Sequence, residues 1–240
     1  MHPCETCHLR RTSVFAPFSE GELAFMMDFR DGEVQLAPGE ILFQESESLS
    51  HFYTALSGQG GRYKILANGE RQLVNFVFPG DVAGLSGSLT GETASSMQAV
   101  SAMRLCRFRK RRLPELFRDH PERAYALTWI AAAEENFLSE IIATLGRRNA
   151  LQRTAWALLR IFRRLSALNL CDAEGAVPFP YRQADLADAL GLSMVHTNKT
   201  LARLRDHVQI GGRRLRVKDE CALAELSLTD PDEPRLRPLI

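Results

Sequence analysis

Residues 181–205, which read YRQADLADALGLSMVHTNKTLARLR, decide the fold of the C-terminal part of this chain. Leu186 and Leu190 stand four positions apart on one face of a helix, and Gly191 is expected to end that helix because glycine adopts a left-handed backbone at little cost. Ser193 then supplies the N-cap of a second helix. Two short helices joined by such a turn predict a helix-turn-helix, whose second helix enters the DNA major groove. The second helix should bury Thr197, Leu201, Leu204 and Val208.

The residues after Ile210 predict a basic hairpin beside these helices. Gly211 and Gly212 are expected to make a tight turn into residues 213–218, RRLRVK, where apolar Leu215 and Val217 alternate with basic side chains. The pattern is typical of the wing of a winged helix, which lies along phosphates and adds affinity without reading sequence. The basic residues predicted on phosphates are Arg214, Arg216 and Lys218.

Charge is distributed unevenly along the 240 residues. The net charge is only +1, yet residues 146–220 contain 14 Lys and Arg against 7 Asp and Glu, which leaves the rest of the chain negative. A basic C-terminal third on an acidic body points to a polyanionic partner. Taken alone, this asymmetry fits a solvated helical surface equally well.

Residues 15–108 have the pattern of a small all-β sandwich or barrel, because short apolar runs alternate with Gly, Pro and Asn. The clearest signal is Asn68-Gly69, which lies between the strand candidates 63–66 and 72–77. A two-residue type I′ turn needs a positive φ at both positions, and Asn-Gly tolerates this best. We therefore predict a β-hairpin with that turn.

Residues 121–145 predict a long helix with one apolar stripe. The stripe faces either a second copy of the chain or the chain's own β domain, and the pattern favours neither. Glu134 interrupts it, and a partly wet dimer axis would tolerate that carboxylate better than a dry core would. Residues 146–149 indicate a hinge before a second helix. The stripe consists of Ala124, Leu127, Ala131, Leu138, Ile141 and Leu145.

Several classes of protein are disfavoured by the composition. No apolar run is long enough to span a membrane, the first residues lack the features of a secretory signal, and five sparse cysteines do not suggest a disulfide scaffold, so we expect a cytoplasmic protein. A jelly-roll metal enzyme is a weak alternative, since His51 is the only histidine in residues 15–108. A protein-interaction module is the other rival.

Motifs spread along nearly the whole chain resemble the Crp/Fnr family of bacterial transcription regulators. They are residues 18–23, 37–43, 68–72 and 78–81, followed by 185–187, 191–193 and 200–201. The resemblance implies an α+β chain, not an enzyme, that binds double-stranded DNA as a homodimer and acts on RNA polymerase. The implied organisation is an N-terminal cysteine-containing tail (1–14), a β-roll sensor domain similar to cyclic nucleotide-binding jelly rolls (15–118), a dimerisation helix (119–146), a winged helix-turn-helix (147–228) and a C-terminal tail (229–240).

Alignment with the family from Gly191 and Ser193 assigns base reading to Met194, Val195, Asn198 and Lys199. Asn198 suits adenine, Val195 a thymine methyl group, and Lys199 guanine O6 and N7. Helix packing is the alternative for Met194 and Val195, although their places beside the cap put them away from Leu201 and Leu204. The predicted DNA-contacting set is completed by Arg182, Gln183, Ser193 and Arg203, for which a solvated surface is the competing interpretation.

The resemblance leaves the sensed signal open. Cyclic AMP is disfavoured, because no Lys or Arg lies between Arg71 and Arg104 to pair with its phosphate. Cys4, Cys7 and Cys106 match the first, second and fourth cysteines of the branch that binds an iron–sulfur cluster, but Ser13 stands where the third is expected. Zinc on Cys4, Cys7 and His8, with His2 as another candidate ligand, is a further possibility. Unligated thiols and an effector-independent regulator are the remaining alternatives.

Overall fold

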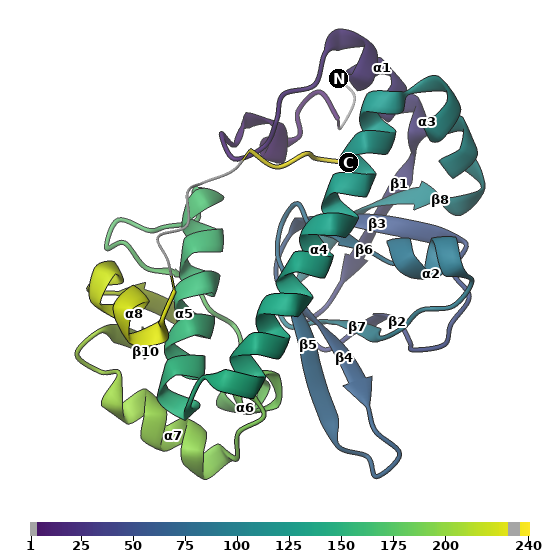
Figure 1. The fold of residues 1–240 in the computed structure, drawn as a ribbon. Coiled ribbons are helices and arrows are strands. Elements are labelled where there is room, and N and C mark those ends of the chain that lie inside the picture. The colour runs from purple at the N-terminus through teal and green to yellow at the C-terminus, as the bar shows by residue number, and fades with distance from the viewer. Residues whose placement is uncertain (1–3, 230–235) are drawn as a thin grey trace. The chain divides into compact units, whose positions relative to one another are not determined.

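The computed structural model describes residues 4–229 and 236–240 and divides into two compact units. The first unit comprises Met1–Glu134 together with Leu236–Ile240, and the second comprises Glu135–Arg235 (Figure 1). Each unit has its own core, and each is described by itself. His2 lies outside the described residues, and the domain bounds expected from the sequence stay a prediction.

The first unit contains two four-stranded antiparallel sheets, which are not closed into a barrel. One has the order β1-β8-β3-β6 and the other the order β2-β7-β4-β5. This is the expected β-rich sensor fold. The strands of the first sheet are β1 (Arg30–Leu36), β8 (Met103–Arg109), β3 (His51–Ser57) and β6 (Val82–Ala83), and those of the second are β2 (Ile41–Phe43), β7 (Ser96–Ala99), β4 (Gly60–Ile65) and β5 (Arg71–Val77).

The β4–β5 hairpin forms where the sequence predicts it, but the predicted type I′ turn is wrong. Gly69 has a φ of 84°, whereas Asn68 keeps a negative φ. The Gly69 amide donates to the Leu66 carbonyl at 2.8 Å, and the Leu66 amide donates to the Glu70 carbonyl at 2.8 Å. The loop therefore has three residues with glycine in the left-handed position. The Asn68 side chain stabilises it by accepting from the Glu70 amide at 3.0 Å.

Helices cover the sheets and complete the core of the first unit. Phe29, Phe52 and Phe108 are fully or almost fully buried, and their ring centroids lie 5.2–6.3 Å apart. Aromatic residues bury large apolar areas, so this cluster is a major source of stability. The helical elements are the 3₁₀ segments η1 (His8–Arg11) and η2 (Lys110–Arg112) and the α-helices α1 (Glu20–Phe29), α2 (Leu85–Thr90), α3 (Leu113–Asp119) and α4 (Pro121–Arg147).

The long helix α4 does not use its predicted stripe as one surface. Ala124 and Leu127 are buried in the core of the first unit, whereas Ala131 and Leu138 are exposed. Glu134 does not need a wet dimer axis, because its carboxylate accepts from Arg62 Nη1 at 2.5 Å and from Asn75 Nδ2 at 3.0 Å. The N-terminal part of α4 thus packs on its own sheets, which was one of the two alternatives.

The second unit is built around α5 (Ala150–Ala167), which Asn149 caps by accepting from the Gln152 amide. Its apolar face, including Leu158 and Leu159, is fully buried. Among the described residues, no helix combines the length and apolar character that a membrane span requires. The other elements are α6 (Gln183–Leu190), α7 (Met194–Arg203), α8 (Glu220–Ser227) and a sheet of the order β10-β11-β9, formed by β10 (Val208–Gly211), β11 (Arg214–Val217) and β9 (Val177–Pro178) (Figure 1).

Candidate nucleic-acid interface

Helices α6 and α7 form the predicted helix-turn-helix. Gly191 ends α6 in the left-handed conformation, with a φ of 60°, and donates its amide to Ala187. Ser193 begins α7 as its N-cap and accepts from the His196 amide at 3.3 Å. These local signals act within a few residues, which explains why the turn was readable from the sequence.

Packing against α5 fixes how α7 is rotated. Thr197 and Leu204 are fully buried, and Leu201 is partly exposed. Thr200, which the sequence analysis missed, is buried too, and its hydroxyl lies 3.2 Å from that of Thr154 on α5. Arg153 of α5 donates to the Leu190 carbonyl at 3.1 Å and so holds the end of α6. The opposite face of α7 is therefore turned to solvent.

That solvent-facing side carries the predicted base-reading residues. Met194 is 44% exposed and Val195 is 62% exposed, and the side chains of Asn198 and Lys199 are also exposed. The predicted outward orientation of Met194 and Val195 is confirmed. His196 shares this surface, with its Nδ1 atom 3.2 Å from Ser193 Oγ. Its position next to the cap could have been noticed from the sequence.

The basic hairpin is present, but its turn lies one residue later than predicted. Gly212 and Arg213 have φ values of 55° and 60°, and Gly211 pairs with Arg214 at the end of the ladder. Positive φ at both central positions makes this a type I′ turn. Leu215 is fully buried and anchors the hairpin to the unit, whereas Arg216 is exposed.

Arg214 is held by an acidic partner within the unit. Its Nη2 atom lies 2.5 Å from Asp172 Oδ2, and its side chain is 40% exposed. The backbone amides of Ala176 and Glu174 donate to the other oxygen of Asp172, and together with the guanidinium they hold the pKa of that carboxyl below its ordinary value. Asp172 therefore remains charged at neutral pH. Lys218 donates to the Arg205 carbonyl at 2.7 Å.

The remaining residues that are predicted to contact DNA lie on the same two helices. Arg182 and Gln183 are exposed at the start of α6, and Arg203 is exposed at the end of α7. The Arg182 backbone amide donates to Asp185 Oδ2 at 2.8 Å, and Arg182 itself is exposed. The second unit therefore presents a surface of exposed cations around an amide and two apolar side chains.

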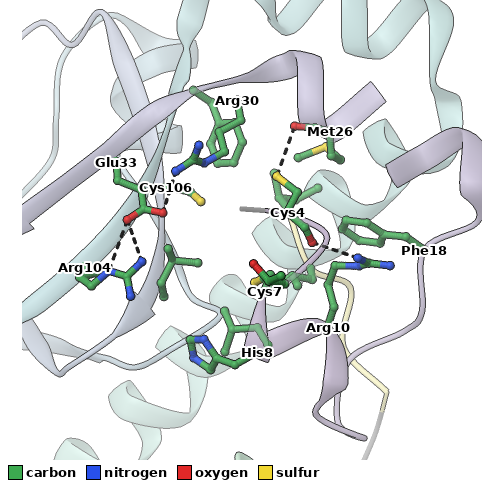
Figure 2. A pocket seen from close by; sticks show the side chains of 16 residues that line it. Cys4, Cys7, His8, Arg10, Phe18, Met26, Arg30, Glu33, Arg104 and Cys106 are labelled. Carbon is green, nitrogen blue, oxygen red and sulfur yellow. Dashed lines mark hydrogen bonds and ion pairs between the residues drawn. The ribbon is translucent and has the colours of Figure 1, made fainter. Parts of the chain in front are cut away.

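The predicted cysteines lie in the first unit around one cavity of about 210 Å³. Cys4, Cys7 and Cys106 line it, together with His8 and three arginines (Figure 2). Burial raises the pKa of Cys106 to about 11 and also raises that of Cys4, although Arg30 opposes the shift at both thiols. Both thiols are therefore protonated at neutral pH.

Among the described residues, which do not include His2, this arrangement does not fit a four-thiolate iron–sulfur cluster or a zinc ion. The unit offers three cysteines, and Ser13 is exposed. Within residues 4–229 and 236–240, no three His, Cys, Asp or Glu side chains lie close enough together to hold a metal ion.

The expectation that cyclic AMP does not bind stays a prediction. The phosphate of a cyclic nucleotide needs a cation, and Arg62 on β4 is already paired with Glu134 at 2.5 Å and donates to Ser95 at 3.2 Å. No Lys or Arg lies between Arg71 and Arg104. Burying the phosphate beside an occupied guanidinium would leave one of the two anions without a counterion.

Comparisons with known proteins match both units. A family model described as a cyclic nucleotide-binding domain matches residues 33–120, and one described as a Crp-like helix-turn-helix domain matches residues 152–226. The nitrogen fixation regulation protein FixK of Bradyrhizobium diazoefficiens is 31% identical over 206 residues, which cover 86% of this chain and 85% of the relative.

Two further matches agree with these. The transcriptional activator protein FnrL of Cereibacter sphaeroides is 27% identical over 97% of this chain and 94% of its own. The structure of FixK2 from Bradyrhizobium japonicum is similar in fold, with a TM-score of 0.73 at 24% identity, over 84% of this chain and 98% of that one.

Proposed function

Because the chain belongs to the Crp/Fnr family of DNA-binding transcription regulators, we propose that two copies bind a roughly two-fold DNA site, each through the exposed face of α7. The observation that carries this proposal is the outward orientation of Met194, Val195, Asn198 and Lys199 on a helix whose other face is buried. A major groove admits one α-helix, and the residues at the start of that helix reach the base edges.

The exposed face of α7 combines three kinds of base contact. Asn198 offers an amide for adenine, Val195 an apolar surface for a thymine methyl group, and Lys199 an ammonium for guanine O6 and N7. Lysine is a point charge and lacks the planar fork that makes arginine a bidentate guanine reader. We therefore expect Lys199 to discriminate less sharply than an arginine would.

Phosphate contacts would come from the exposed basic and polar side chains around this helix. Arg182, Gln183 and Arg203 flank it, Ser193 lies at its start, and Arg216 extends from the hairpin. Arg214 would have to exchange Asp172 for a phosphate, so it contributes less than Arg216. Each phosphate contact releases counterions and steepens the salt dependence of binding.

Dimerisation would use exposed side chains of α4. Tyr125 is 71% exposed and Ile142 is 72% exposed, and Ala132 and Leu138 are exposed between them. Tyr125 and Ala132 stand one heptad apart, and Leu138 and Ile142 stand one helical turn apart. Replacing Ile142 by Asp should produce monomers in sedimentation experiments, whereas Leu89→Asp, which adds the same charge to a leucine that is 60% exposed outside α4, should not.

The central test separates base reading from phosphate binding. DNA selected from random sequence would be compared with unselected duplex for Lys199→Ala and Arg216→Ala. Lys199→Ala should lose about 1–3 kcal/mol on selected DNA only, whereas Arg216→Ala should weaken both duplexes alike and lower the salt slope by about 1. Equal losses on both duplexes for Lys199→Ala would show that α7 does not read bases. RNA polymerase, implied by the family, would be the partner of the DNA-bound dimer.

A further inference from the structure

The residues that follow the second unit return to the first unit and pair with its N-terminal segment. Arg237 forms a parallel bridge with Phe15. The Ala16 amide donates to the Arg237 carbonyl at 2.8 Å, and the Arg237 amide donates to the Val14 carbonyl at 2.8 Å. The backbone of residues 236–240 is therefore held as an added extended segment (Figure 1).

Side chains of the first unit anchor the same segment. Arg237 Nη2 lies 3.1 Å from Asp81 Oδ1. Arg123 of α4 is buried and donates to the Leu239 carbonyl at 3.0 Å, while its other amino group lies 2.6 Å from Glu22. A guanidinium fixed by a carboxylate is a strong, well-oriented donor for that carbonyl.

The end of the segment is buried in apolar surroundings. Leu239 is 4% exposed and Ile240 is 5% exposed, and Ile240 belongs to the core cluster that includes Phe25 and Leu127. Leu239 and Ile240 also form part of the wall of the cavity that Cys4, Cys7 and Cys106 line. The segment therefore closes one side of the cysteine cavity.

We propose that residues 236–240 act as a strap, which docks on the surface formed by residues 14–16, Asp81 and Arg123 and closes one side of the cysteine cavity. Undocking of the strap opens this cavity and exposes Cys106 to reagents in solution.

The strap is tested by measuring how fast a reagent modifies the thiols that line the cavity. Leu239→Asp places a charge at a buried position and should undock the strap in the full-length chain. Iodoacetamide labelling, followed by mass spectrometry, should then modify Cys106 about tenfold faster, because labelling follows local opening. Cys171 and Cys221 are exposed in the second unit and serve as internal references. Leu89→Asp makes the same change at a leucine that is 60% exposed.

A second variant separates undocking from general damage. A chain ending at residue 235 should label like Leu239→Asp, and both should keep the circular dichroism of the parent protein. Unchanged Cys106 labelling in the two variants would overturn the proposal. The measurement does not involve DNA, so failure of the strap and failure of DNA binding are distinguishable.

Discussion

Replacing Glu134 by alanine should destabilise the first unit itself rather than a contact between two copies of the chain. The carboxylate accepts from Arg62 Nη1 at 2.5 Å, and each of its oxygens lies 3.0 Å from Asn75 Nδ2. The Arg62 side chain is 22% exposed, and without Glu134 its remaining contact is Ser95. The variant therefore leaves a partly desolvated guanidinium without a carboxylate.

The size of the expected loss of stability follows from the exposure of the Arg62 and Glu134 side chains. A hydrogen bond to a charged group contributes about 1.5–3 kcal/mol, but solvent screens this pair because Glu134 is 34% exposed. We expect a loss of about 1–2 kcal/mol, and a double-mutant cycle with Arg62→Met should give a coupling of about 1 kcal/mol.

Hydrogen exchange is the suitable assay because it reports on one part of the chain. Amides of β4 and β5 should exchange roughly 5–30 times faster in Glu134→Ala, while the dimer dissociation constant from sedimentation should stay unchanged. Glu135→Ala, at the exposed neighbouring position, is the matched control and should leave that exchange unaltered. If Glu134→Ala instead weakens the dimer and leaves exchange in β4 and β5 as it was, Glu134 lies on a dimer axis and the reasoning fails.

Three further predictions concern single side chains. Leu204→Ala should cost about 2–5 kcal/mol of stability in thermal unfolding, because Leu204 is fully buried, whereas Val195→Ala should change stability by less than about 0.5 kcal/mol. Ser193→Ala should lower the stability of the second unit by about 1 kcal/mol through the lost cap, as measured by urea unfolding. Cys106 has a pKa raised from 9.0 to about 11 in the folded protein. The stability that its protonated thiol contributes is therefore fully present below pH 9 and is lost as the pH rises through 11. Cys106→Ala should therefore remove roughly 2–3 kcal/mol of the alkaline loss of stability, and an unchanged pH profile would contradict this.

Local signals made the helix-turn-helix predictable from sequence. The Leu186–Leu190 spacing, the left-handed Gly191 and the Ser193 cap each act over a few residues, and the structure confirms all three. The outward orientation of Met194 and Val195 followed from the same helical periodicity. The roles of these residues on DNA stay predictions.

The geometry of the two turns was less predictable than the presence of the two hairpins. Asn68-Gly69 suits a type I′ turn, yet the Asn68 side chain stabilises a three-residue loop instead. At the other hairpin, the register of β10 on β11 puts the turn at Gly212-Arg213, because Gly211 is still paired with Arg214. Strand register depends on pairing along the whole ladder, which two turn residues do not specify.

The sequence by itself determined the two-unit order of a β-rich domain, a long helix and a winged helix-turn-helix, because periodicity, capping and glycine turns are encoded between neighbours in the chain. Only the tertiary structure decided which charges find partners: Glu134 with Arg62, Asp172 with Arg214, and Asp81 with Arg237. Residues far apart in sequence meet only after the elements have packed, and electrostatic pairing depends on distances of a few ångströms that no spacing in the sequence records.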